Sequence, residues 1–133
     1  LINKTFSEYN LDKTQRAFLS RLYLGTLEQV IFLDYVINSY SSINTQKMKP
    51  VIKNILRMST YQMLFMDSVP DHAAINEAVK LATKKGFGNL KGFINGVLRT
   101  IQREGVPKDI PENVKYSLPS NAGSDTLCIS FAK

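Results

Sequence analysis

The hydrophobic residues of this chain recur mainly at spacings of three and four, which is the period of amphipathic α-helices. The clearest pattern spans residues 90–103, where one helix face carries Leu90, Phe93, Ile94, Val97, Leu98 and Ile101. We expect a preceding helix that opens after Pro70 with Asp71 as its N-cap and ends before Gly86, which suits the C′ position. Asn89 is expected to cap the helix that follows. The pattern therefore predicts two helices joined by a short glycine-bearing turn.

Residues 51–66 are apolar on most sides of a helix, which is typical of a central helix buried all round. Pro50 is well placed as the first residue of this helix. Nearer the N-terminus, Asp12 and Gln15 form a capping-box pattern that predicts a helix start. Gly25 interrupts the pattern that follows, so we expect a kink or two helices in series there. No strand-like alternation is long enough to form a sheet, and the predicted fold class is all-α.

The character of the chain changes after residue 104, where prolines break any helical pattern and polar residues gather. We expect a helical domain over residues 1–104, a linker over 105–119, and an unstructured or non-native tail over 120–133. The chain starts at Leu1 inside a helix-like pattern, and we expect it to be a fragment of a longer protein.

The composition restricts the chemistry more than it defines it. Hydrophobic residues make up 44% of the 133 residues, which is a globular composition. No apolar run approaches the roughly 20 residues that span a membrane, and an intracellular, cytoplasmic location fits. Cys128 is the single cysteine and His72 the single histidine, so we expect no internal disulfide, no metal site and no catalytic triad. No residue is assigned a catalytic role.

The net charge of +6 is concentrated in residues 46–104, which hold ten basic and four acidic side chains. A regional basic excess suits a polyanion such as nucleic acid, although an ordinary solvated helix surface gives the same count. Every fourth position along the last predicted helix carries Lys91, Asn95, Arg99 and Arg103, and lysine and arginine in such a line suit contact with phosphates. The candidate nucleic-acid contacts are Lys80, Lys84, Lys85, Lys91, Arg99 and Arg103. Phe87, in the turn beside them, could stack on an unpaired base or pack in the core.

Asn76 and Asn95 sit beside core positions on the two predicted helices. A polar amide next to a core persists only when it is hydrogen-bonded. We therefore expect both side chains to tie the helix pair to neighbouring backbone, as structural polar residues that touch no ligand.

This chain resembles the NusB-like fold in the stretch ILRMSTYQMLFMDSVPDHAAINEAVKLATKKG and in the later stretch KGFINGVLRTIQRE. That fold is an all-α RNA-binding domain. Three details are similar to the N-terminal domain of the Sun/Fmu (RsmB) family of 16S ribosomal RNA 5-methylcytosine methyltransferases. They are the triplet from His72 to Ala74, the opening of the last helix from Lys91 to Phe93, and its Val97-Leu98-Arg99 segment.

The resemblance implies a NusB-like helical bundle that lacks the family's first helix and is not itself catalytic. It would position ribosomal RNA for the catalytic domain of the same protein, which lies beyond the linker and binds S-adenosylmethionine. Cys128 takes no part of that domain's catalytic role. The alternatives are a NusB-type transcription antitermination factor that binds RNA with a ribosomal protein, and a module for protein interaction only. The resemblance leaves the oligomeric state undefined, although a missing first helix would expose apolar surface and favour pairing of chains.

Overall fold

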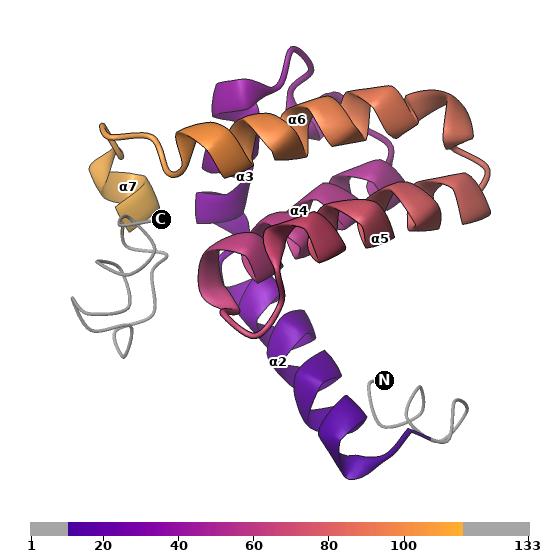
Figure 1. Cartoon of the computed structure of the whole chain (residues 1–133). Coiled ribbons are helices and arrows are strands. Elements are labelled where there is room, and N and C mark those ends of the chain that lie inside the picture. The colour runs from indigo at the N-terminus through magenta and orange to yellow at the C-terminus, as the bar shows by residue number, and fades with distance from the viewer. Residues whose placement is uncertain (1–10, 116–133) are drawn as a thin grey trace.

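The computed structural model describes residues 11–115, which form a bundle of helices without any strand in that range (Figure 1). The α-helices are α2 (Lys13–Glu28), α3 (Val30–Tyr40), α4 (Pro50–Phe65), α5 (Asp71–Lys84), α6 (Lys91–Glu104) and α7 (Glu112–Lys115). Two short 3₁₀ turns, η1 (Thr45–Lys47) and η2 (Gly88–Leu90), precede α4 and α6. The predicted all-α class is confirmed. No helix among the described residues is long and apolar enough to cross a membrane.

Helix α4 is the centre of the bundle, as its all-round apolar pattern predicts. It contacts α2, α3, α5 and α6, and it starts with Pro50 at the first helical position. Its buried apolar side chains are Ile52, Ile55, Leu56, Tyr61, Met63 and Leu64. Arg57 fixes α4 to α3 through two hydrogen bonds of 2.7 Å to the carboxylate of Asp34. The core therefore forms around one helix that has neighbours on most of its sides.

Helix α2 begins with the predicted capping box. The Gln15 backbone amide donates to Asp12 at 2.7 Å, and the Asp12 amide donates to the Gln15 side chain at 3.0 Å. The predicted interruption at Gly25 is wrong in position, because α2 continues through Gly25 and the break falls at Gln29. A Cβ atom at Gly25 would overlap the Tyr61 side chain of α4. This glycine therefore permits the close approach of two helices.

The turn between α5 and α6 confirms Gly86 as the residue after the helix end. Gly86 has φ 88°, and the amides of Gly86 and Phe87 donate to the carbonyls of Thr83 and Ala82 at 3.1 and 2.8 Å. These two bonds satisfy two of the four carbonyl groups that a helix end leaves free.

Both predicted N-caps of this helix pair are wrong. Pro70 is the N-cap of α5, and Asp71 is its first helical residue without a side-chain capping bond. The carbonyl of Pro70 accepts from the Ala73 and Ala74 amides, and the Asp71 carboxylate lies near the positive end of the helix. Asn89 lies inside η2, because the chain enters α6 through a 3₁₀ turn and Leu90 becomes the N-cap.

The segment after α6 packs on the bundle and is no free linker over its first ten residues. The hydroxyl of Tyr40 donates to the Gly105 carbonyl at 2.7 Å, and the Tyr35 hydroxyl donates to the Asp109 carbonyl at 2.6 Å. Val106 and Val114 are buried, and α7 contacts α3. Residues 105–114, at the start of the expected linker, therefore pack against the helices. The expected tail over 120–133, Cys128 included, lies outside the described residues.

Candidate nucleic-acid interface

Helices α5 and α6 lie side by side and run in opposite directions across one side of the bundle (Figure 1). Alanines at positions 74, 78 and 82 face inward from α5, and the small side chains let the two helices approach closely. The inward face of α6 carries Ile94, Val97, Leu98 and Ile101. The outward faces of both helices carry most of the predicted site residues.

A shallow groove of about 440 Å³ runs between the outer faces of α5 and α6. Its lining consists of Asn76, Val79 and Lys80 from α5 with Lys91, Gly92 and Asn95 from α6. The structure thus brings together two predicted cations, Lys80 and Lys91, from positions eleven residues apart. Lys80 lies 3.5 Å from Glu77, but both side chains are 74% exposed, so this ion pair restrains the lysine little.

Asn76 and Asn95 line this groove and are exposed, contrary to the expectation that they tie the helices to buried backbone. Neither amide hydrogen-bonds to another group among the residues that the structure describes. The reason is geometric: the alanines of α5 and the large side chains of α6 fill the contact between the helices, and both asparagines lie just outside it. Both amides are therefore available to a ligand.

Arg99 and Arg103 extend the cationic surface along α6, and both are exposed. Arg99 donates to the Gln102 side chain at 3.3 Å, and Arg103 donates to Glu104 at 3.0 Å. Each step of four residues turns a helix by about 40° beyond a full circle. Arg99 therefore stays on the groove side after Asn95, whereas Arg103 lies on the outermost line of α6.

Lys84 and Lys85 are also exposed, but they do not join the groove. Lys84 lies one turn beyond Lys80. Compared with Lys80, it is turned about 40° further around the helix, away from the groove residue Val79. Lys85 is the C-cap of α5, beside the turn at Gly86. The six predicted cations thus divide into a groove pair, an α6 pair and a pair at the end of α5.

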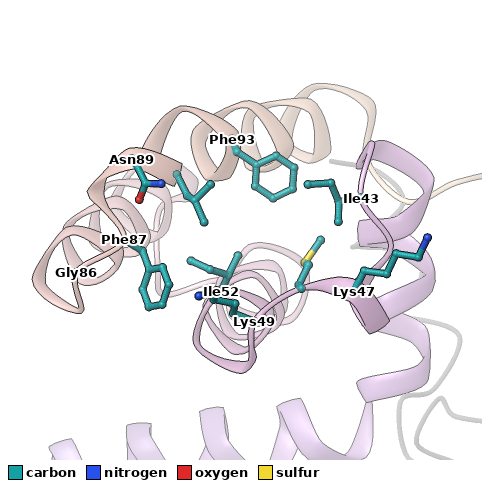
Figure 2. A pocket seen from close by; sticks show the side chains of 10 residues that line it. Ile43, Lys47, Lys49, Ile52, Gly86, Phe87, Asn89 and Phe93 are labelled. Atoms are coloured by element: carbon teal, nitrogen blue, oxygen red, sulfur yellow. The ribbon is translucent and has the colours of Figure 1, made fainter.

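A second hollow, of about 370 Å³, opens on the opposite flank of α6 (Figure 2). Apolar side chains make most of its wall, with lysines at the rim. The lining residues are Ile43, Lys47, Met48, Lys49, Ile52, Gly86, Phe87, Asn89, Leu90 and Phe93. The Lys49 ammonium lies 5.6 Å from the centre of the Phe87 ring, within the range of a cation–π contact. We call this hollow the phenylalanine pocket.

Sequence reasoning missed Lys47 and Lys49, although it noted Phe87. The two lysines lie two positions apart before Pro50, and no local pattern connects them with a turn some forty residues later. Only the packing of α4 against the end of α5 and the start of α6 brings these groups to one opening. The one available signal was the basic excess of residues 46–104, which includes both lysines.

The chemistry of this surface is that of binding. Apolar and aromatic walls accept flat rings, and exposed lysines at the rim of a hollow bind phosphate. Within residues 11–115, no group of three histidine, cysteine, aspartate or glutamate side chains is placed to hold a metal ion. The fold and the site together define this protein as a small all-α binding domain. Two lysine-lined hollows lie on opposite sides of its helix α6.

The chain belongs to the NusB family, whose model matches residues 1–103. It is 42% identical over 107 residues to the probable ribosomal RNA small subunit methyltransferase B of Bacillus subtilis (strain 168). That match covers 80% of this chain and 24% of the relative. The corresponding protein of Synechocystis is 31% identical over 118 residues, with 88% and 26% covered.

The transcription antitermination protein NusB of Thermodesulfovibrio yellowstonii is also similar, with 35% identity over 102 residues. This match covers 76% of the chain and 66% of that protein. The chain therefore spans about a quarter of the methyltransferase relatives and about two thirds of this antitermination relative. No solved structure matches the chain.

Proposed function

We propose that this chain is an RNA-binding domain that positions ribosomal RNA for an S-adenosylmethionine-dependent cytosine-C5 methyltransferase and carries no catalytic group itself. The observation that carries the proposal is the phenylalanine pocket with its lysine rim, beside the cations of α6. The methyltransferase part of the proposal is supported by 42% identity to a relative named for ribosomal RNA methylation.

The phenylalanine pocket suits an unpaired base. A flat ring entering it would meet the side chains of Phe87 and Phe93, and stacking of this kind tolerates any base. Lys47 and Lys49 at the rim would hold the adjoining phosphates. Structured RNA offers such bases in loops and bulges, whereas a regular duplex stacks its bases inside.

The cations on the other flank of α6 would follow the RNA backbone. Lys80 and Lys91 in the groove and Arg99 beyond it are exposed, so a phosphate reaches them without any rearrangement of the core. Arg103, one turn beyond Arg99, would hold a further phosphate, whereas Lys84 and Lys85 add a broader positive field that speeds encounter with RNA. These contacts are electrostatic and largely independent of sequence.

In this proposal, methyl transfer and binding of S-adenosylmethionine belong to a catalytic domain outside this chain, in the bacterial cytoplasm. The NusB-like domain would bind ribosomal RNA and pack on that catalytic domain. A free antitermination factor that binds RNA with a ribosomal protein is the second candidate. It is favoured by the match that covers 66% of an antitermination protein. A module for protein interaction alone is the third candidate.

The test is a titration of the chain with structured RNA at two salt concentrations. Replacing Arg99 and Arg103 by glutamate should weaken binding for every RNA tested and lower the slope of log K against log salt by about 2. A charge-matched control replaces Lys13 and Lys108, which are exposed away from both hollows, by glutamate. This control should leave the slope nearly unchanged.

One further variant tests the pocket itself. Phe87→Ala should weaken binding of RNA that contains an unpaired loop, with less effect on a fully paired duplex of equal length. Equal affinity of all variants and wild type, with intact folds by circular dichroism, would leave protein interaction as the function. Preference for a transcript leader over 16S ribosomal RNA fragments would favour the antitermination candidate.

A further inference from the structure

The groove between α5 and α6 carries cations toward both ends and neutral amides in its middle. The two helices run in opposite directions, so the step of four residues from Lys80 back to Asn76 matches the step forward from Lys91 to Asn95. The two lysines therefore share one end of the groove, and the two asparagines lie one turn further along it. Arg99 follows after another turn of α6, exposed and on the groove side. We call the lining of this groove, together with Arg99, the amide groove.

The two asparagine amides give the middle of the amide groove its chemistry. Each amide offers two N–H donors and one carbonyl acceptor. Both side chains are exposed, and neither hydrogen-bonds to another group within residues 11–115. The carboxylate of Glu77 stays out of the groove, because one step beyond Asn76 turns it about 100° further from Val79. The groove therefore suits a neutral group that both donates and accepts hydrogen bonds and that lies between anionic groups.

Among the groups of a nucleic acid, the ribose 2′-hydroxyl fits this description. It is both a donor and an acceptor, it neighbours the phosphates of its own strand, and DNA lacks it. Base pairing turns the Watson–Crick edges of the bases inward, whereas the 2′-hydroxyls of paired RNA stay open in a wide, shallow minor groove. The amides therefore suit the sugars of a paired RNA segment.

The spacing of the cations agrees with the minor groove of an RNA duplex. Lys91 and Arg99 are eight residues apart, which is about 12 Å along the helix axis. The minor groove of B-DNA is only about 6 Å wide, so its phosphate rims are too close together for this spacing. Its major groove is about 12 Å wide and 8.5 Å deep, and two helices side by side, each about 10–12 Å across, are too broad to enter it. A wide and shallow groove accepts the outer faces of both helices without insertion.

We propose that the amide groove binds the minor groove of a paired RNA stem, with Asn76 and Asn95 on 2′-hydroxyl groups and the flanking cations on the phosphates of the two strands. This inference rests on the proposed function and names the class of RNA, which is a stem that adjoins an unpaired nucleotide. The phenylalanine pocket that receives this nucleotide lies on the other flank of α6, about one helix diameter of 10–12 Å away. Helix α6 therefore lies at the junction between the stem and the unpaired segment.

The experiment compares two hairpin RNAs of the same sequence and loop, whose stems carry either 2′-hydroxyl or 2′-fluoro groups. Fluorine keeps the stem in the A-form but donates no hydrogen bond. The wild-type chain should bind the hydroxyl stem about tenfold more tightly, because the fluoro stem loses a hydrogen bond to each amide. The double variant Asn76→Leu/Asn95→Leu should bind both hairpins equally. Because it removes no charge, its slope of log K against log salt should equal that of the wild type.

The matched control is Asn54→Leu, at an exposed position of α4 that lines neither hollow. This control should keep the wild-type preference for the hydroxyl stem, and circular dichroism confirms the fold of each variant. Equal binding of the two hairpins by the wild-type chain would overturn the inference and leave RNA binding standing. The inference also fails if the double variant keeps the preference or if Asn54→Leu loses it. Absence of binding to either hairpin would overturn the proposed function together with the inference.

Discussion

Replacing Gly25 by alanine should have two opposing effects on the free energy of unfolding, and their sizes can be compared. Alanine is favoured over glycine by about 1 kcal/mol inside a helix, and Gly25 lies well inside α2. The new Cβ would overlap three atoms of the Tyr61 side chain, Oη, Cζ and Cε2. Tyr61 is only 8% exposed, and its ring stacks on Phe65 at a centroid distance of 5.0 Å. Burial and the stack on Phe65 therefore oppose a rotation of the ring away from the new atom.

Overpacking a core costs about 1–3 kcal/mol, and overlap with three ring atoms belongs at the upper end of that range. After subtracting the helix gain, Gly25→Ala should destabilise the fold by about 2 kcal/mol. For a chain of this size, the melting temperature should fall by roughly 6–12 °C. Thermal and urea unfolding, followed by circular dichroism at the helix band, measure both quantities.

Gly96→Ala is the matched control. Gly96 lies inside α6, and a Cβ atom there meets nothing within 4 Å. The same substitution should therefore stabilise the chain by about 0.5–1 kcal/mol. Combining Gly25→Ala with Tyr61→Ala should cost less than the sum of the two single changes, by about 1–3 kcal/mol. The reasoning fails if Gly25→Ala is as stabilising as Gly96→Ala, or if the two changes at Gly25 and Tyr61 are additive.

Two further predictions concern stability. Asn76→Leu and Asn95→Leu should each change the free energy of unfolding, measured by urea denaturation, by less than about 0.5 kcal/mol, because both amides are exposed. A loss above about 1 kcal/mol would show that the amides belong to a buried hydrogen-bond network. Burial, and secondarily Glu104, raise the pKa of the Tyr40 hydroxyl. The folded chain then keeps this proton at pH values where the unfolded chain loses it, so stability should fall as pH rises above about 10. Tyr40→Phe should make that fall shallower, and parallel pH profiles of the urea midpoint for both proteins would contradict this.

The sequence predicted the elements whose signals are local. The capping box at Asp12 and Gln15, Pro50 at a helix start and Gly86 after a helix end each depend on a few neighbouring residues, and all three are confirmed. The NusB-like resemblance is confirmed by the family match over residues 1–103. The central helix was also predictable, because a helix that is apolar on most sides needs neighbours on most sides. In a small domain only the centre provides them.

The sequence-based predictions are wrong where tertiary contacts, and not neighbouring residues, determine the structure. Gly25 looks like a helix breaker in the sequence, and only the approach of Tyr61 gives it a different role. Asn76 and Asn95 neighbour core positions along the chain but lie outside the helix contact, since a shift of one residue turns a side chain by about 100°. The phenylalanine pocket depends on segments some forty residues apart, so periodicity within one helix could not reveal it.

The attachment of residues 105–114 to the bundle changes how far a neighbour can travel. Ten extended residues span up to about 35 Å. Because Tyr35 and Tyr40 hold this stretch against α3, that length is unavailable as a tether. The chain therefore reaches residue 114 beside α3, where α7 packs, and does not leave the end of α6 as a free strand. The two tyrosine hydroxyls thereby fix the path of the chain from α6 to α7 along the side of α3.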